Sequence, residues 1–578
     1  MRLKHGLDRL RFITQAGALL VGALVLVGLA WLAFDAARAD GLVIRPFSVP
    51  PALAQRGVTG EAVAAEIADH MGEMAQTARS SEAQRRVAAA RSEISIEIPE
   101  TGISVSQLEQ WLTEKLGHQR RVTGELMSAP DGTLVLNARD DDTPLAEQRG
   151  GEADLSGLLQ KTAEDLYSRE QPASYQAYLN RAGRFEDLRK WLTARTTSTD
   201  RQVRALAYMG LASANLTSDL MESRGLQEKA IATDPKASPR GLFNLAGSEF
   251  SLGHTERGMQ LIAQDIAQLS DSANFPTLAP DVRKQFLRDD RAMNAARRGN
   301  NLAVLAMHRE AAVNAQLGFA IGQSFDLNIS QDLAALHDVA GARRALAAFD
   351  PENTQQKDRT WGTVITIDSQ AEDWSGAWAA WQESIKPWQT RTDKGAYNYP
   401  PRANGAFILI KLGRLDEAQA LLDQTPLDCV PCVTTRGQLA TARGQTAIAD
   451  HWFSEATRIG PSLPVTWYNH GYALLERKDY VGAIPQFREA SRRGPKWADP
   501  LEAWGEALLA QGQTHAAIDK FKAAEKLAPR WGRDYLYWGE ALAKQGKTDQ
   551  ARAQFAAAAG MDLTPTERAE LARARGHG

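Results

Sequence analysis

The feature that most constrains the fold of this chain is a spacing of 34 residues in its C-terminal third. Glycine holds one position of this spacing, and an alanine, a phenylalanine, a second alanine and a proline follow it at fixed distances. The positions are Gly437, Gly471, Gly505 and Gly539; Ala449, Ala483, Ala517 and Ala551; Phe453, Phe487, Phe521 and Phe555; Ala456, Ala490, Ala524 and Ala558; and Pro461, Pro495 and Pro529. Only Leu563 departs from the pattern. Chance does not produce such a pattern, which predicts stacked structural repeats.

The residue types in each copy predict a pair of helices. The glycine and the first alanine suit places where two helices of a hairpin approach closely. The phenylalanine and the second alanine, three residues apart on the second helix, share a face that we expect to contact the next unit. The proline stops the unit because it cannot continue a helix. Turns between the two helices are indicated at 443–445, 511–513 and 545–547.

This pattern resembles the tetratricopeptide (TPR) repeat, a helix–turn–helix of 34 residues. We predict four regular repeats over 429–563 and a C-terminal tail over 564–578. Weaker copies at 182–188, 252–262, 333–349 and 412–422 predict a degenerate TPR-like solenoid over 172–428. The chain as a whole resembles the membrane-anchored TPR proteins of bacteria, and the expected fold class is mainly α.

The resemblance implies a concave groove, formed by the first helix of each unit, that binds peptides. It places in this groove the residues three before and one after each repeat glycine. These residues are Thr434, Gln438, Tyr468, Tyr472, Glu502, Glu506, Leu536 and Glu540. TPR domains that clamp a C-terminal carboxylate carry Lys, Arg and Asn there, and this chain does not. We therefore expect a tyrosine anchor beside an acidic stretch, suited to a basic or polar segment. The alternative is that the carboxylates form a solvated helix face.

The N-terminal part of the chain predicts a membrane anchor. Residues 12–34 are 23 residues without a charge, which as a helix of about 34 Å would span a bilayer. Four basic residues precede them and two follow, so residues 1–11 are expected in the cytoplasm and the bulk of the chain in the periplasm. A cleaved signal peptide ending near Ala37-Arg38-Ala39 is the alternative, although the apolar stretch is long for one.

Residues 40–170 predict a small membrane-proximal α+β domain. Strands are indicated at 42–49 and 93–98, and helices at 59–78, 106–117 and 154–168. Pro130-Asp131-Gly132 is a turn signal that predicts a hairpin between 122–127 and 133–138. The acidic run at 140–142 is interpreted as a solvated loop.

Cys429 and Cys432 are the two cysteines of the chain and form a CxxC motif at the start of a repeat helix. In an exported protein we expect them to form a structural disulfide. The alternative is a thiol–disulfide assembly factor, since a helix N-terminus lowers a thiol pKa, but thioredoxin-type chemistry needs a βαβ context that is missing here.

Tryptophans recur at helical spacing and in the turns between repeats. Trp374, Trp378 and Trp381 share one helix face and are interpreted as packed core. Trp497 and Trp531 follow the turn prolines of two repeats, where we expect them to staple neighbouring units.

Charge and motifs exclude several function classes. The chain has 67 Lys and Arg against 70 Asp and Glu, a net charge of −3, which gives no electrostatic argument for nucleic-acid binding. It carries no phosphate loop, HExxH or GxSxG signature. We predict a scaffold that binds proteins, with no enzyme activity, cofactor or metal. A polysaccharide- or cell-wall-associated accessory protein is a further alternative.

Overall fold

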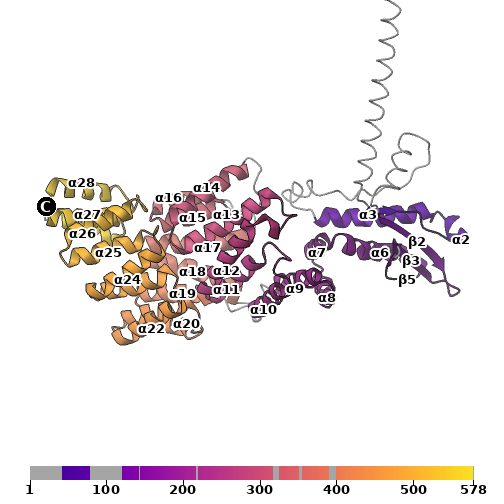
Figure 1. Ribbon diagram of the computed structural model, residues 1–578, viewed down its shortest axis with the longest axis horizontal. Helices are drawn as coiled ribbons and strands as arrows, with labels where there is room; N and C mark the ends of the chain where they lie inside the picture. The colour runs from indigo at the N-terminus through magenta and orange to yellow at the C-terminus, as the bar shows by residue number, and fades with distance from the viewer. Residues whose placement is uncertain are drawn as a thin grey trace, which may run out of the picture. The chain divides into compact units, whose positions relative to one another are not determined.

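The computed structural model describes residues 42–78, 120–141, 143–215, 219–316, 325–349, 354–389 and 399–576 (Figure 1). The chain divides into two compact units, Met1–Leu188 and Arg189–Gly578, and each is described by itself. The predictions for residues 1–11, for the span at 12–34, for the strand at 93–98 and for the helix at 106–117 lie outside the described residues. Within the described ranges, no helix combines the length and the apolar character needed to cross a bilayer.

The first unit is a small sheet covered by helices. The strands run in the order β1-β2-β3-β4, with β5 on β3. The elements are β1 (Leu42–Ile44), α2 (Pro51–Ala54), α3 (Gly60–Ala78), β2 (Arg120–Ser128), β3 (Leu134–Asp140), β4 (Thr143–Pro144), β5 (Gln148–Gly150), η1 (Glu152–Asp154), α6 (Leu155–Glu170), α7 (Pro172–Arg181) and the start of α8 (Phe185–Arg195).

The β2–β3 hairpin and helix α3 form because their apolar residues share one side. Strands β2 and β3 pair antiparallel with Leu126 opposite Leu136, and both side chains are buried. Gly132 takes the left-handed backbone conformation that the turn requires, at φ 82°. On α3, Ile67 and Met71 are buried on one stripe, as helical spacing predicts. The hairpin and this helix therefore match the sequence pattern.

The second unit is a solenoid of helices, and every named element in it is helical. Its elements are α9 (Arg201–Asn215), α10 (Leu220–Thr233), α11 (Gly241–Leu252), α12 (Thr255–Ser270), η2 (Ser272–Asn274), α13 (Pro280–Arg297), α14 (Asn301–Gln316), α15 (Phe325–Ala335), α16 (Val339–Ala348), α17 (Thr354–Gln370), α18 (Trp374–Gln389), α19 (Tyr399–Lys411), α20 (Leu415–Leu422), α21 (Val430–Ala442), α22 (Thr446–Ile459), α23 (Pro464–Glu476), α24 (Tyr480–Arg493), α25 (Asp499–Ala510), α26 (Thr514–Glu525), α27 (Gly532–Lys544), α28 (Thr548–Ala559) and α29 (Pro565–Gly576). The chain is thus mainly helical with a TPR-like solenoid.

In the four regular repeats, each glycine lies directly against the phenylalanine of its own hairpin. A Cβ added at Gly505 would lie 2.5 Å from Cε1 of Phe521, and the other three glycines show the same arrangement. The Phe521 side chain is fully buried. The close approach predicted for the glycines is confirmed. The phenylalanines contact the next unit as well, since Phe453 stacks on His470 with ring centroids 5.5 Å apart.

The turns form where the sequence places them. Gly444, Gly512 and Gly546 have φ between 70° and 79°, so three of the four hairpins turn on a left-handed glycine. In the second repeat Lys478 takes this conformation, at φ 63°. This conformation costs a residue with a Cβ more than it costs glycine.

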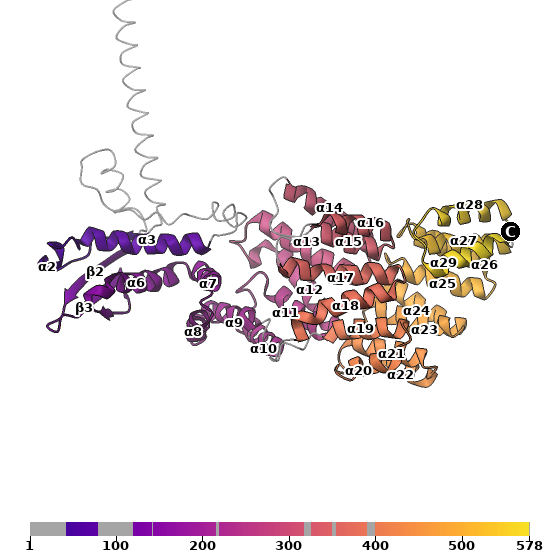
Figure 2. The ribbon, with the colours of Figure 1, turned by 180° about the vertical axis from the view of Figure 1, so that it is seen from behind.

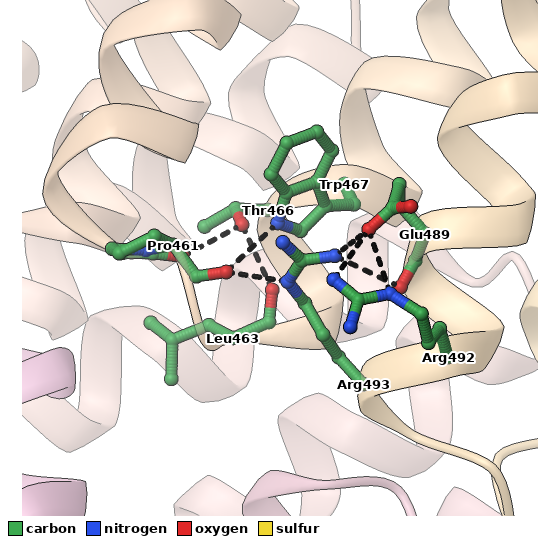
Figure 3. Close-up of polar contacts among 8 residues, drawn as sticks. Pro461, Leu463, Thr466, Trp467, Glu489, Arg492 and Arg493 are labelled. Atoms are coloured by element: carbon green, nitrogen blue, oxygen red, sulfur yellow. Dashed lines mark hydrogen bonds and ion pairs between the residues drawn. The ribbon is translucent and has the colours of Figure 1, made fainter.

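The turn between the first two regular repeats shows how the units are joined (Figure 3). The carbonyl oxygen of Pro461 accepts hydrogen bonds from Trp467 Nε1, at 3.2 Å, and from Arg493 Nε. The Arg493 guanidinium also lies 4.2 Å from the centre of a Trp467 ring, and it pairs with Glu489. The turn is therefore held both to helix α23, which follows it in the chain, and to α24, the second helix of the same repeat.

The solenoid also packs against itself between residues far apart in the chain. We call this contact the seam. It joins turns of the upstream helix pairs to downstream turns and the first residues of the helices after them. The contacts pair 253–254 with 428–432, 298–299 with 494–499, 337–340 with 530–531 and 562, and 372 with 566. Val430 N donates to Gly253 O at 2.9 Å, and Ala340 N donates to Asp562 Oδ2 at 2.7 Å. Figure 2 shows helices α15–α18 beside α25–α29. The superhelix thus closes on itself.

Trp497 and Trp531 belong to this seam. Trp497 packs on Tyr468 of the neighbouring unit, with ring centroids 4.8 Å apart, and also against Gly299 of an upstream turn. Trp531 stacks on His337, with ring centroids 3.8 Å apart and ring planes at 6°. We predicted that both rings join neighbouring units; they also join successive turns of the superhelix.

Candidate functional site

A cavity of about 690 Å³ lies inside the last turn of the superhelix. Six helix pairs, α17–α18 to α27–α28, lead around this turn, and the start of α29 then returns to the turn between α17 and α18. There Thr566 Oγ1 donates to Glu372 Oε2 at 2.7 Å. The first helices α19, α21, α23, α25 and α27 contribute side chains to the wall. The seam turns, the end of α17 and the starts of α18 and α29 contribute the rest.

Aromatic rings form one part of the cavity wall. Tyr468 and Tyr472 lie one helical turn apart on α23, with ring centroids 5.8 Å apart. Trp374 meets Phe407 edge to face at 5.8 Å, and both line the cavity. The core prediction for the tryptophans therefore holds for Trp381, which is buried, but not for Trp374. Trp374 opens α18 directly after a seam turn, so its ring reaches the interior of the superhelix.

Uncharged polar and basic groups form a second part of the wall. Gln438 Nε2 donates to Asn469 Oδ1 at 3.1 Å, which links α21 to α23. Lys411 Nζ lies 3.8 Å from Glu476 Oε1, at the outer limit of an ion pair. Arg477 is engaged by Asp450 at 2.8 Å, so its charge is largely balanced outside the cavity.

The acidic end of the cavity is organised around Arg533. Its Nε donates to Glu502 Oε1 at 3.1 Å, and another guanidinium nitrogen donates to Glu506 Oε2 at 2.7 Å. Glu567 lies 3.8 Å from the same guanidinium. Burial raises the pKa of Glu502 to about 8, because Arg533 offsets only part of the cost of desolvating it and the neighbouring carboxylates add repulsion. The acidic stretch predicted from sequence is thus partly neutralised from within the protein.

The eight predicted groove residues divide between the cavity and other places. Gln438, Tyr468, Tyr472 and Glu502 line the cavity. Glu506 is not among the lining residues and is bound to Arg533. Glu540 lies with Tyr537 and Lys544 in a separate cavity of about 470 Å³.

Two of the eight are buried and line neither cavity. Leu536 is fully buried in the apolar core of the last repeats, and Thr434 is buried with its hydroxyl donating to Val430 O at 2.9 Å. Placing Leu536 and Thr434 in the groove is therefore corrected.

Several residues that line the cavity lie outside the positions three before and one after each repeat glycine, so the sequence analysis did not predict them. Arg533 lies six residues before Gly539. Asn469 and Glu476 share the helical face of Tyr472 and could have been found from that spacing. His337 and Glu372 could not, because they come from upstream turns that only the closure of the superhelix brings to the cavity.

Cys429 and Cys432 are joined by a disulfide at the start of α21. Both side chains are fully buried, and a Cβ at Gly253 would overlap Cys429. A thiol or thiolate from solvent has no path to a bond enclosed in this way. The arrangement gives no support to the assembly-factor alternative.

No protein-family model matches the chain, and no curated protein matches it. Similar solved structures include MamA of AMB-1, which is 21% identical with a TM-score of 0.25; the match covers 28% of this chain and 97% of MamA. The Cut9–Hcn1 hetero-tetramer of the APC/C is 14% identical with a TM-score of 0.40, covering 73% and 86%. Yeast Tom70 is 15% identical with a TM-score of 0.33, covering 72% and 96%. The assignment of a TPR-like solenoid rests on the helix pairs of this chain.

Proposed function

We propose that the second unit is a protein-interaction scaffold that holds a segment of a partner polypeptide in the cavity of about 690 Å³. The observation that carries the proposal is the convergence of Tyr468, Tyr472 and Trp374 with a small set of polar side chains inside one superhelical turn. Aromatic walls with a few placed polar groups are typical of binding sites. Tyrosine and tryptophan also dominate the energetics of protein interfaces.

The charges of the cavity favour a basic or polar segment. Its lining contains six acidic side chains and three Lys and Arg side chains, so acidic groups remain in excess although Glu502, with its pKa raised to about 8, keeps its proton at neutral pH. The acidic residues are Glu372, Glu476, Asp499, Glu502, Asp562 and Glu567, and the basic residues are Lys411, Arg477 and Arg533. Complementary charge selects partners and speeds their association.

The place of the scaffold in the cell is part of the same proposal. Residues 12–34 would anchor the chain in a bacterial inner membrane, with residues 1–11 in the cytoplasm and the chain after residue 34 in the periplasm. The role is binding rather than catalysis. This part of the proposal is supported by the uncharged sequence of the segment and by the basic residues before it.

Capture of partners from detergent-solubilised membranes tests the proposed site. Tyr472→Ala removes an aromatic wall, and Glu476→Lys reverses one charge of the lining. We expect each variant to recover less partner protein than the unaltered chain, with the larger loss for Glu476→Lys if the segment is basic. The control Val481→Ala alters a side chain that is 76% exposed and lies outside the cavity. Unchanged recovery with both cavity variants would reject the site.

A further inference from the structure

The seam determines how a segment can reach the cavity. The turns at 337–340 and 372 contribute His337, Val339 and Glu372 to the cavity lining, so they form a wall across the side of the superhelix. A partner that crosses this wall needs it to move. We propose that the seam is a gate: the turns at 337–340 and 372 separate from the turns at 530–531 and 562–566 and admit the partner segment sideways. This inference rests on the proposed function and adds how the site is reached.

The gate end of the seam is held by a few polar contacts. Ala340 N donates to Asp562 Oδ2, and Thr566 Oγ1 donates to Glu372 Oε2, each at 2.7 Å. The Arg530–Asp338 pair, at 3.3 Å, includes an arginine that is 54% exposed. The two hydrogen bonds end on carboxylates and so contribute more than neutral ones, whereas the exposed ion pair adds little net stability.

One ring contact completes the gate end. The imidazole of His337 stacks on Trp531, and its Nε2 lies 3.3 Å from Asp499 Oδ1. His337 is held in the left-handed region at φ 61°, which is uncommon for a residue with a Cβ. The contact therefore depends on one side chain presented by a single turn, whereas helix pairs are held by continuous apolar packing.

The other end of the seam has polar contacts too, such as Ser462 Oγ donating to Glu256 Oε2 at 2.9 Å, but it adds apolar packing and serves as the hinge. Val430 packs with Met259 and Leu463 in a buried apolar cluster. Val430 N donates to Gly253 O at 2.9 Å, and the enclosed disulfide of Cys429 lies against the same glycine. Separating this end would expose a cluster of apolar side chains, whereas separating the gate end exposes the single Trp531 ring and polar groups that water can solvate.

Thiol labelling inside the cavity tests the gate without any partner. Gln438→Cys places one reactive thiol on the lining, and the native cysteines are joined and buried. A small methanethiosulfonate and a bulky polyethylene-glycol maleimide then report access. We expect the small reagent to react readily and the bulky reagent to react slowly. Adding His337→Ala and Asp562→Ala should raise the bulky reagent's rate about tenfold or more and change the small reagent's rate less than twofold.

Asp479→Ala in the Gln438→Cys background is the matched control. Asp479 Oδ1 accepts a hydrogen bond from Gly482 N at 2.9 Å, the same kind of contact that Asp562 makes to Ala340, but away from the seam. The control should leave both labelling rates unchanged. The gate is overturned if the bulky reagent reacts as fast as the small one before loosening, if loosening changes neither rate, or if the control produces the same rise.

Amide exchange decides the question if the loosened variant fails to fold. In the unaltered chain the amide of Ala340 should exchange at least about tenfold faster than the amides in the middle of α23, because the gate opens without unfolding of the helix pairs. Equal exchange rates would contradict the gate. Either result leaves the proposed binding function standing, since no partner is present.

Discussion

The regular repeats at 429–563 and the upstream helix pairs pack by the same rule with different residues. In every regular repeat a glycine of the first helix receives the phenylalanine of the second. Upstream, the glycine of one contact is Gly258 on the second helix of its pair, facing Phe250 on the first, and in another Gly405 faces Trp381 of the preceding pair. Close helix pairing thus needs a small residue opposite a ring, but not at one fixed position. A search for a fixed 34-residue spacing therefore detects the regular repeats but not the upstream helix pairs.

Replacing the phenylalanine of a helix pair by alanine should produce the largest difference in stability between the regular repeats and the upstream pairs. Phe521→Ala empties a fully buried site, and we expect a loss of about 3–5 kcal/mol in the free energy of unfolding. Phe250 is half-buried beneath Arg297, so Phe250→Ala should cost less than about 3 kcal/mol. Urea denaturation with amide exchange would measure both, since repeats can melt separately. A larger loss at Phe250 would contradict the comparison.

Substituting two glycines with left-handed backbone conformation shows how much tight packing at the seam restricts an upstream turn. Gly253→Ala and Gly413→Ala both place a Cβ in a hairpin turn with φ above 70°, which costs about 1–2 kcal/mol. At Gly253 the Cβ would also overlap Cys429, whereas nothing lies within 4 Å of it at Gly413. We expect Gly253→Ala to cost about 1–3 kcal/mol more in chemical denaturation. Equal losses would show that this end of the seam is not tightly packed.

A pair of helical glycines tests the packing rule itself. Gly505→Ala would push a Cβ to within 2.5 Å of the Phe521 ring, and we expect it to lower the free energy of unfolding by about 1–3 kcal/mol. Gly247 in α11 has no neighbour within 4 Å of an added Cβ. Gly247→Ala should therefore stabilise its helix by about 0.5–1 kcal/mol. Thermal unfolding of the two variants would show shifts of opposite sign; shifts of the same sign would break the rule.

The disulfide lies where the two regions meet. Its removal should lower the free energy of unfolding by less than Phe521→Ala does. Closing a loop of this length contributes about 2 kcal/mol. The variant with Cys429→Ser and Cys432→Ser should lose that amount in denaturant unfolding. Reducing the unaltered chain while it is unfolded, and refolding it in reductant, should bring it to the same stability, which is the control. A double variant as stable as the oxidised chain would show that the bond adds nothing to the start of α21.

Both regions contain a buried carboxyl group that should make stability depend on pH. Burial raises the pKa of Glu502 to about 8 and that of Asp265, which faces Asp290, to about 7. The folded chain then keeps protons that the unfolded chain releases above about pH 4.5. The free energy of unfolding should therefore fall as pH rises from about 5 to 8.

Amide substitution assigns this effect to each region. Glu502→Gln should flatten the pH dependence in the regular repeats, and Asp265→Asn should do so upstream, as measured by thermal melts at pH 5 and pH 8. An unaltered chain that is more stable at pH 8 than at pH 5 would contradict the burial of both groups.

The sequence predicts those features that depend on neighbours close in the chain. The 34-residue period locates the helix pairs, and the left-handed turns at Gly444, Gly512 and Gly546 follow from it. Of the residues predicted for the groove, Tyr468 and Tyr472 line the cavity, whereas Leu536 packs in the core of the last repeats, which spacing along one helix does not reveal. Arg533 and His337 were missed because their partners are distant in the chain: Glu506 lies 27 positions from Arg533, and Trp531 lies 531 − 337 = 194 positions from His337.

Site-specific photo-crosslinking in intact cells tests the central claim most directly. A photoreactive amino acid at Asn469 would lie on the cavity wall, and the same amino acid at Val481 would point to solvent from α24. If the cavity holds partner segments, a covalent protein adduct should form from position 469 and not from position 481. An adduct from 481 with none from 469 would contradict the account.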